Sequence, residues 1–355
     1  MHKKLFIPGP TEVNGDVLAE MARPMIPHRG SEFSELYRTV IPKVQRLLYT
    51  GNKIFLSTSS ATGLMEGAVR NCVKKKCLSL VCGAFSKRWH EITLANGKEA
   101  DALEVPWGMA IKPEMVDERL STGEYDAVTL VHNETSTGIQ NPLKEIAGVV
   151  RKYPDVMFMV DTVSSMGGIR IDVDELGIDV CLASVQKALA LPPGFAICSI
   201  SQGAFKRSEQ VKNRGYYFDF QAFLKYDGKG ETIVTPSIPH FYALNRQLDR
   251  MFAEGLENRF ARHTKMAEIC REWARRHFGL YPEAGYESDT LTVIRNTRQI
   301  DVSNLNAELA KKGKCIANGY GKIKDETFRI AHLGELTVAD INELLRDIKE
   351  FMDNS

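Results

Sequence analysis

The 355-residue sequence contains no apolar run near the roughly 20 residues that a membrane-spanning helix needs. Its formal net charge is +1, so no excess of one sign indicates nucleic acid or an acidic partner. The seven cysteines are scattered without a CxxC pair, which indicates neither a zinc site nor a disulfide framework. Pro8-Gly9-Pro10 interrupts the first apolar stretch before a signal core could form. We expect a reduced, cytoplasmic protein without a metal site and without a membrane partner.

The phosphate-binding signatures of nucleotide enzymes are also missing. The chain has no Walker A motif, and no G-x-G-x-x-G follows a predicted strand. Internal repeats and low-complexity tracts are absent from the sequence as well. The sequence therefore does not favour the binding of a nucleoside triphosphate or a dinucleotide. It also does not indicate a repeat architecture.

The sequence does contain short apolar runs that alternate with helical stretches, which is typical of an α/β protein. Buried parallel strands read as nearly continuous apolar runs, and these runs have that character. The predicted strands are 53–57, 78–82, 102–107, 127–132, 156–161, 180–184 and 195–200.

The pattern changes from about residue 240. One long helical segment over 240–278 leads to strands near 290–295 and 327–333 and to a final helix over 338–352. We predict a large domain over 16–255 and a small C-terminal domain over 256–355. Residues 1–15 form an N-terminal segment that we expect to contribute to the active site.

Polar clusters follow five of the predicted strands. In an open α/β sheet, ligands bind at the carboxyl ends of the strands, so these clusters predict one shared site. They are SSATG (59–63), CGAFSK (82–87), HNETSTG (132–138), DTVSS (161–165) and SVQK (184–187).

Each cluster also has an ordinary structural interpretation. Ser60-Ala61-Thr62 can simply cap a helix, or its backbone N–H groups can receive a phosphate at the helix start. Asp161 can be a cap, or it can pair with the protonated ring nitrogen of a cofactor. Phe85 can belong to the packing, or it can stack on a flat ligand.

Lys187 distinguishes these interpretations. It is the single charged residue in ASVQKALALPPG (183–194), among small and apolar neighbours. It is either a surface lysine or an amine of lowered pKa that can form a Schiff base with an aldehyde. With Gln186 beside it and Asp161 upstream, Lys187 completes the groups expected of a pyridoxal phosphate enzyme: an amine for the aldehyde and an acid for the pyridine nitrogen.

The chain resembles the class V, fold type I, pyridoxal phosphate-dependent aminotransferases of the alanine–glyoxylate and serine–pyruvate group. This resemblance implies a large domain with a mostly parallel seven-stranded sheet between helices, and a smaller C-terminal α+β domain. The matching segments run through nearly the whole chain: PGPTEV (8–13), RPMIPHRGSEF (23–33), HNETSTG (132–138), MVDTVSSMGG (159–168), SVQKALALPPG (184–194), EGLENRFARH (254–263) and FRIAHLG (328–334).

The resemblance also implies roles for single residues around the cofactor. Lys187 would carry the Schiff base, and Asp161 would pair with the pyridine nitrogen. Val163 and Phe85 would contact the two faces of the ring, and Thr135 would hydrogen-bond near the ring hydroxyl. The phosphate would be held by Ser60, Ala61, Thr62 and Gln186.

Three further residues complete the implied site. Arg329 would hold the substrate α-carboxylate in a bidentate fork, with Gly9 beside the substrate. Thr235 would reach the phosphate of the neighbouring subunit's cofactor, which implies a homodimer with shared active sites. Many family members have a tyrosine where this chain has Thr232, so one phosphate contact is shortened or lost here.

The implied reaction transfers an amino group from a small amino acid, with alanine or serine favoured, to a small 2-oxo acid such as glyoxylate or pyruvate. It would pass through the Lys187 Schiff base with ping-pong kinetics. Family members acting on aspartate, ureidoglycine or aminoethylphosphonate remain alternatives. The segment 212–230 lies where the group binds or gates substrate, but the sequence assigns no role to its individual residues.

Two other chemistries compete with this interpretation. A cysteine desulfurase or lyase on the same fold needs a mobile cysteine, and Cys315 is the candidate, although it lies in an apparent short strand. A serine hydrolase of the SxxK type would use Ser184 and Lys187. That motif should open a helix, and Pro192-Pro193 leaves little room for one.

Overall fold

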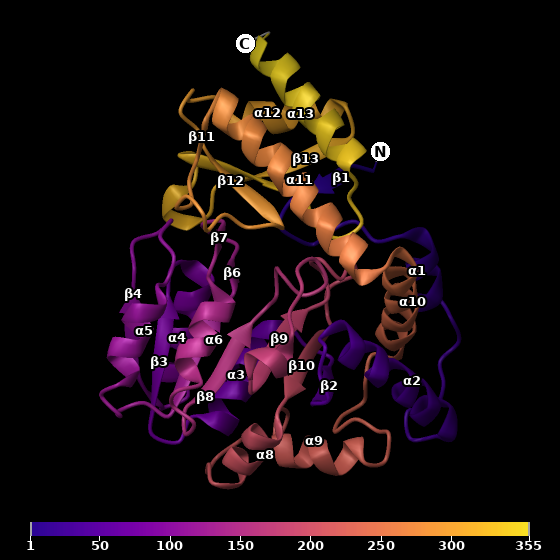
Figure 1. The fold of residues 1–355 in the computed structure, drawn as a ribbon. Helices are drawn as coiled ribbons and strands as arrows, with labels where there is room; N and C mark the ends of the chain where they lie inside the picture. Colours follow the sequence, from indigo (N-terminus) through magenta and orange to yellow (C-terminus); the bar gives the residue numbers. More distant parts are fainter. Residues whose placement is uncertain (1, 354–355) are drawn as a thin grey trace.

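Seven strands form the central sheet of the computed structural model, which describes residues 2–353. Their order is β2-β10-β9-β8-β5-β3-β4, and only β10 runs antiparallel to its neighbours. The mostly parallel sheet is thereby confirmed (Figure 1). The strands are β2 (Lys53–Ser57), β3 (Lys76–Val81), β4 (Glu99–Glu104), β5 (Ala127–Val131), β8 (Met157–Asp161), β9 (Val180–Ser184) and β10 (Ala196–Ile200).

One strand lies away from its predicted position. We predicted 102–107 from the apolar run ALEVPW, whereas β4 spans Glu99–Glu104 and pairs in parallel with β3 from Lys76 to Val81. β4 is the edge strand of the sheet and is mostly exposed or half-buried, so its apolar run does not mark its bounds. Pro106 cannot donate a ladder hydrogen bond, which explains why the strand ends before it.

Helices cover both faces of this sheet because side chains alternate along each strand. In β8, Phe158 and Val160 enter one apolar cluster, whereas Met157 and Met159 enter the other. Helices α3 (Ala61–Cys72), α4 (Ala84–Ala95), α8 (Gln202–Glu209) and α9 (Phe220–Asp227) contribute to the second cluster. The first cluster is covered by α1 (Gly15–Met21), α2 (Ser31–Leu47), α5 (Pro113–Leu120), α6 (Leu143–Val150), α7 (Val173–Leu176) and α10 (Ile238–Glu254).

A second sheet of five strands lies above the carboxyl ends of the central strands in Figure 1. Its order is β1-β13-β14-β12-β11, so the N-terminal strand pairs in parallel with β13 of the C-terminal region. The strands are β1 (Lys4–Phe6), β11 (Gly279–Leu280), β12 (Leu291–Arg295), β13 (Lys314–Asn318) and β14 (Thr327–Ala331). Helices α11 (Leu256–His277), α12 (Val302–Lys311) and α13 (Val338–Asp353) accompany them, with the short elements η1 (Gly321–Ile323), β6 (Asn133–Glu134) and β7 (Ile139–Gln140) nearby in the fold.

The predicted continuous helix over 240–278 is wrong at one point. Gly255 separates α10 from α11 with φ 85° and ψ 127°, a conformation that side-chain-bearing residues rarely adopt. The break redirects the chain from the central sheet to the five-stranded sheet (Figure 1). The division into 1–15, 16–255 and 256–355 stays a prediction. Within residues 2–353, no helix is long and apolar enough to cross a membrane.

Candidate active site

A pocket of about 150 Å³ lies where several central strands end. The structure brings together in its lining most of the residues predicted from the sequence: Ser60, Ala61, Thr62, Phe85, Thr135, Asp161, Val163, Gln186 and Lys187. Met65, Arg88, Val131, Asn133 and Ser184 complete the lining. Gly9, Arg329 and Thr235 lie outside it, and the structure places each differently.

Lys187 lies in a tight turn that follows β9. Its carbonyl oxygen accepts hydrogen bonds from Thr11 Oγ1 at 3.0 Å and from the Ala190 amide at 2.8 Å. Ala190 closes the turn at φ 54°, in the left-handed region. The Lys187 amine donates to the carbonyl oxygen of Pro8, so the N-terminal segment lies against it.

Burial, together with the nearby cation of Arg329, lowers the pKa of Lys187 to about 8, whereas Asp161 acts in the opposite direction. A substantial fraction of the amine is therefore neutral near pH 8. A neutral amine is the form that can attack a carbonyl carbon or accept a proton.

Asp161 is the last residue of β8 and is only 3% exposed. Its Oδ1 accepts a hydrogen bond from the Val163 amide at 2.6 Å. Burial raises the pKa of this carboxyl to about 7, and nearby Glu134 acts in the same direction, against the hydrogen bond from Val163. A buried carboxylate of this kind is strongly stabilised by a cationic N–H group placed against it.

The start of α3 forms the end of the pocket that suits an anion. Ser60 is the N-cap residue, and its side chain makes no capping hydrogen bond. Ser184 Oγ already accepts the Ala61 amide at 2.7 Å. The free N–H groups of a helix start carry partial positive charge, and the amide of Gln186 lines the same pocket.

Phe85 lies within an aromatic and cationic group. Its ring centroid is 5.3 Å from that of Tyr320, and the Arg88 guanidinium carbon is 5.0 Å from the Phe85 centroid. The buried carboxylate of Glu134 accepts hydrogen bonds from the Phe85 and Ser86 amides, which fixes the start of α4. The position of the Phe85 ring in the pocket is therefore set by several contacts.

Arg329 and Gly9 do not line the pocket but contact residues that do, Thr135 and Lys187 respectively. Arg329 lies on β14, and its Nε donates to the Asn318 carbonyl at 2.9 Å. Burial lowers the pKa of Arg329 to about 10, although Tyr320 acts in the opposite direction. A Cβ built on Gly9 would lie 2.7 Å from Lys187 Nζ, so Gly9 leaves room for the amine.

Thr235 is exposed on the segment between α9 and α10, away from the pocket lining. Thr232, which stands where many family members have tyrosine, is buried and donates to the Val234 carbonyl at 2.7 Å. Neither side chain takes part in the pocket of its own chain.

Sequence reasoning missed Arg88, Glu134, Asn133 and Tyr320. Asn133 and Glu134 belong to the polar cluster HNETSTG, and Arg88 directly follows the cluster CGAFSK, so the strand-end argument could have included them. Tyr320 follows β13 in a different sheet, and no local pattern connects it to Phe85.

The structure disfavours both competing chemistries. Ser184 ends strand β9 instead of opening a helix, and its hydroxyl oxygen is bound to the Ala61 amide. Cys315 lies within β13, where it pairs with Leu5 of β1. Burial raises the pKa of the Cys315 thiol, so the thiolate that a desulfurase needs is not favoured.

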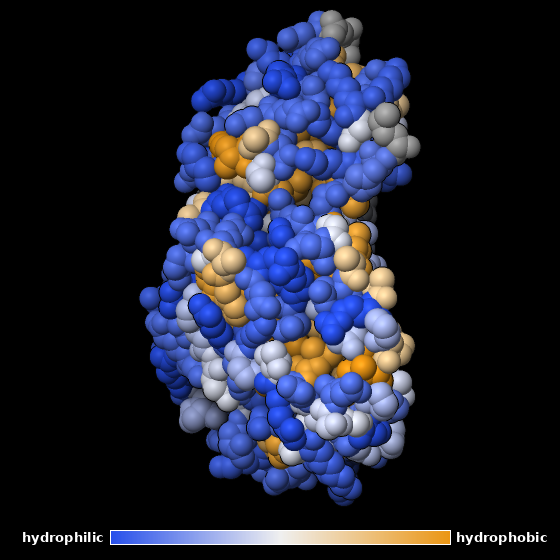
Figure 2. Space-filling model, turned by 90° about the vertical axis from the view of Figure 1, so that its right-hand side faces the viewer, coloured by the Kyte–Doolittle hydropathy of each residue, from blue (hydrophilic) through white to orange (hydrophobic). Residues whose placement is uncertain are grey.

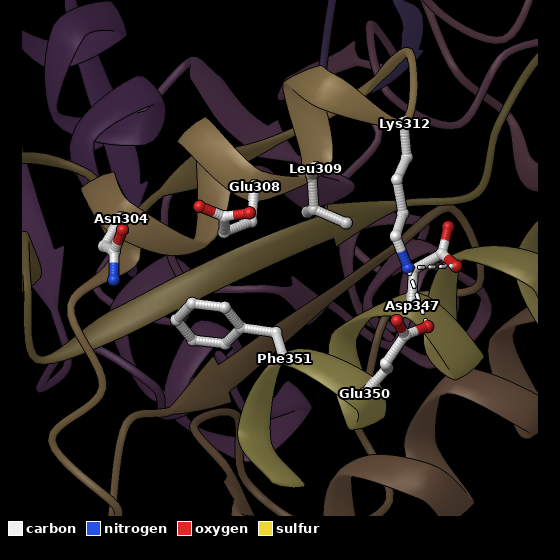
Figure 3. A pocket seen from close by; sticks show the side chains of 7 residues that line it. All are labelled: Asn304, Glu308, Leu309, Lys312, Asp347, Glu350 and Phe351. Carbon is white, nitrogen blue, oxygen red and sulfur yellow. Dashed lines mark hydrogen bonds and ion pairs between the residues drawn. The ribbon is translucent and has the colours of Figure 1, made fainter. Parts of the chain in front are cut away.

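Another pocket, of about 250 Å³, lies between α12 and α13 (Figure 3). Its Lys312 pairs with Asp347 at 3.2 Å and with Glu350 at 2.8 Å. Among the lining residues drawn there, the single cation is thus paired, and its hydrogen bonds to Glu350 and Asp347 raise the pKa of Lys312, so its amine stays protonated. The pocket at Lys187 is therefore the candidate active site.

Comparison with known proteins identifies the family of the chain. The family model "Aminotransferase class-V" matches residues 12–321. An uncharacterized aminotransferase of Methanocaldococcus jannaschii is 40% identical over 341 residues, which cover 94% of this chain and 88% of that protein. A serine–glyoxylate aminotransferase of Methylorubrum extorquens is 32% identical over 362 residues, covering 96% and 87%.

Among solved structures, an alanine–glyoxylate aminotransferase from Nostoc sp. superimposes with a TM-score of 0.92 at 26% identity. The match covers 99% of this chain and 96% of that one. The expected fold type I is confirmed. Because the family model covers most of its length, the chain belongs to the class V aminotransferases and is a pyridoxal phosphate-dependent enzyme.

Proposed function

We propose that this aminotransferase moves an amino group from a small amino acid, alanine or serine, to a small 2-oxo acid, glyoxylate or pyruvate. The observation that carries the proposal is the meeting of Lys187 and Asp161 in one pocket, with Arg329 in contact with Thr135 of the pocket lining. The serine–glyoxylate and alanine–glyoxylate names of the two similar proteins support small substrates.

The residues of the pocket fit pyridoxal phosphate. The uncapped start of α3 at Ser60, with Ala61, Thr62 and Gln186, would hold the phosphate. Asp161 would hold the ring nitrogen, because its buried carboxylate lacks a cationic partner in direct contact among the described residues. Phe85 and Val163 would contact the ring faces, and Thr135, which shares a 2.6 Å hydrogen bond with Ser164, would lie near the ring hydroxyl.

The cofactor, when bound, supplies an aldehyde for the amino group and an electron sink for the substrate α-carbon. Asp161 maintains a proton on the ring nitrogen, because burial makes an unpaired carboxylate there costly. Lys187 Nζ would take the proton from the substrate α-carbon and would hold it for return at the aldehyde carbon of the cofactor. Its lowered pKa leaves the amine neutral for this step.

Arg329 would bind the α-carboxylate of the substrate. Its Nη1 lies 3.4 Å from the Thr135 carbonyl, a long contact that leaves the guanidinium able to turn to a stronger, charged acceptor. Fixing the carboxylate there orients the α C–H bond relative to Lys187. Positioning of this kind accounts for a large part of enzymatic rate enhancement.

We further propose a cytoplasmic homodimer in which Thr235 contacts the partner's cofactor. Thr235 is exposed and does not line the pocket of its own chain, which supports a role toward a second subunit. Exposed apolar side chains support an interface: Met25 is 59% exposed and Tyr216 is 74% exposed. Figure 2 shows apolar patches in orange on the mainly hydrophilic side that bears α1, α2 and α10.

Steady-state kinetics with purified enzyme test this proposal. With alanine or serine as donor and glyoxylate or pyruvate as acceptor, double-reciprocal plots at several acceptor concentrations should give parallel lines, because the two half-reactions are separate. Turnover with aspartate, ureidoglycine or aminoethylphosphonate but not with alanine or serine would overturn the substrate assignment. Sulfide release from cysteine in preference to transamination would overturn the reaction.

A further inference from the structure

One buried guanidinium joins the turn after β8, the strand that ends at Asp161, to the turn after β9, which contains Lys187. Arg259 of α11 is 1% exposed, which is unusual for an arginine. Its Nε donates to the Gly167 carbonyl and its Nη2 to the Ala188 carbonyl, each at 2.8 Å. Gly167 lies in the turn after β8, and Ala188 directly follows Lys187.

The two turns are in close contact at this point. A Cβ built on Gly168 would lie 3.1 Å from Ala188 Cβ, so the segments after β8 and β9 pack together without space between them. The planar fork of an arginine can bind two carbonyl groups at a fixed separation, which the single ammonium of a lysine cannot reproduce. Arg259 therefore sets the distance between these two backbone segments.

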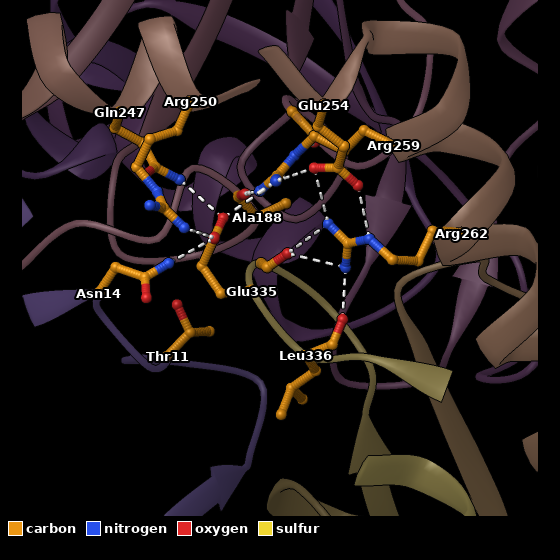
Figure 4. Close-up of polar contacts among 12 residues, drawn as sticks. Thr11, Asn14, Ala188, Gln247, Arg250, Glu254, Arg259, Arg262, Glu335 and Leu336 are labelled. Atoms are coloured by element: carbon orange, nitrogen blue, oxygen red, sulfur yellow. Dashed lines mark hydrogen bonds and ion pairs between the residues drawn. The ribbon is translucent and has the colours of Figure 1, made fainter. Parts of the chain in front are cut away.

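The third nitrogen of Arg259 connects the same turns to the five-stranded sheet (Figure 4). Nη1 lies 3.0 Å from both Glu254 and Glu335, and Glu335 follows β14, the strand that carries Arg329. Burial raises the pKa of Glu335, but Arg259 and the other donors around it hold the value below its usual range. Glu335 is therefore a carboxylate at neutral pH.

We propose that Arg259 is a positioning residue that holds the backbone after Lys187 and Asp161 in register with the loop after Arg329. Arg259 makes its contacts through backbone carbonyls and carboxylates and does not line the pocket. Its effect on the reaction passes through the placement of the Lys187 amine. The inference rests on the proposed role of Lys187 in the active site.

The placement of Lys187 can be measured by its titration. The charged groups around its amine are Asp161, Arg329 and, in the same pocket, Arg88. When the turn is fixed, the amine remains in a dry pocket near Arg329, and its protonated form is disfavoured. When the turn is loosened, water reaches the amine and the protonated form becomes more favourable.

The experiment is a spectrophotometric pH titration of the holoenzyme, in which visible absorbance reports the protonation of the Lys187 nitrogen bound to the cofactor. Arg259→Lys maintains the positive charge but loses the fork. We expect the apparent pKa to rise by at least about half a unit, which is about a threefold change in the protonation equilibrium. The matched control is Arg250→Lys, because Arg250 contacts Glu335 at 3.2 Å but neither turn.

An unchanged titration in folded Arg259→Lys, or an equal shift in Arg250→Lys, would overturn the proposal. If Arg259→Lys does not fold, the same titration of Glu335→Gln tests the proposal, because this variant weakens the ion pair with Arg259 Nη1 and leaves Arg259 in place. A rise in the same direction supports the proposal, and no change overturns it. The titration is independent of substrate turnover, so failure of the proposed transamination would not alter this result.

Discussion

Arg329 Nη1 lies 3.4 Å from the carbonyl oxygen of Thr135, so an arginine of the five-stranded sheet contacts the strand-end loop that lines the pocket in the central sheet. The two residues are 194 positions apart in the chain. The proposed carboxylate-binding group is thus brought to the pocket by the packing of one sheet over the other.

Arg329→Lys should weaken the binding of the amino acid substrate without removing the cofactor. Replacing a bidentate fork by a point charge loses a charged hydrogen bond, which is worth about 2 kcal/mol. We therefore expect kcat/KM for the donor to fall about 30-fold, mainly through KM, in steady-state assays. Arg295→Lys is the control, because Arg295 is exposed on β12 and lies over the Tyr281 ring. An equal loss in both variants would contradict the assignment of Arg329.

Gly9→Ala should disturb the amine of Lys187. Gly9 has φ 127°, and a Cβ there would lie 2.6 Å from Lys187 Cδ and 2.7 Å from Nζ. Moving the amine by about 1 Å costs a large factor in rate, so kcat should fall by about tenfold or more. Gly15→Ala provides the matched control, because a Cβ at that position would have no neighbouring atom within 4 Å. A wild-type kcat in Gly9→Ala would show that catalysis does not need the close approach of the Gly9 backbone to the Lys187 side chain.

Asp161→Asn should change how the stability of the cofactor-free protein depends on pH. Burial raises the pKa of Asp161 to about 7, from 3.8 in the unfolded chain. Between these values the folded state holds the proton and the unfolded state does not, so stability falls as pH rises, by about 4 kcal/mol at most.

Urea unfolding of cofactor-free protein across this window measures the effect. In Asp161→Asn, the free energy of unfolding should lack this part of its dependence on pH. Asp179, whose pKa burial also raises, contributes equally to the wild type and the variant. Identical slopes for wild type and Asp161→Asn would show that Asp161 is ionised throughout. Bound cofactor should also remove the slope, because a cationic ring nitrogen favours the carboxylate.

Most of the central sheet could be predicted because β5, β8, β9 and β10 are buried along their whole length. β8 and β9 read directly as MFMVD and VCLAS, and the polar residues after them are the ones that line the pocket. β4 was misplaced because its side chains are largely exposed, so hydropathy does not mark its bounds. The break at Gly255 was missed because a single glycine within a helical pattern is often tolerated.

Contacts between distant segments could not be predicted from local sequence patterns. The pairing of β1 with β13, the contact of Tyr320 with Phe85 and the fork of Arg259 on two carbonyl groups each join residues far apart in the chain. Arg329 was predicted only through the resemblance to a family. The position of Arg329 beside the pocket depends on how the two sheets pack, and the spacing of residues in the sequence does not show this packing.

Borohydride reduction of the holoenzyme, followed by peptide mass spectrometry, tests the central claim most directly. Reduction should fix the cofactor on the peptide that carries Lys187, and Lys187→Ala should lose both the visible absorbance and the transamination. Lys206→Ala, which removes an exposed lysine of α8, should retain both. Cofactor fixed on a different lysine, or full activity in Lys187→Ala, would contradict the account.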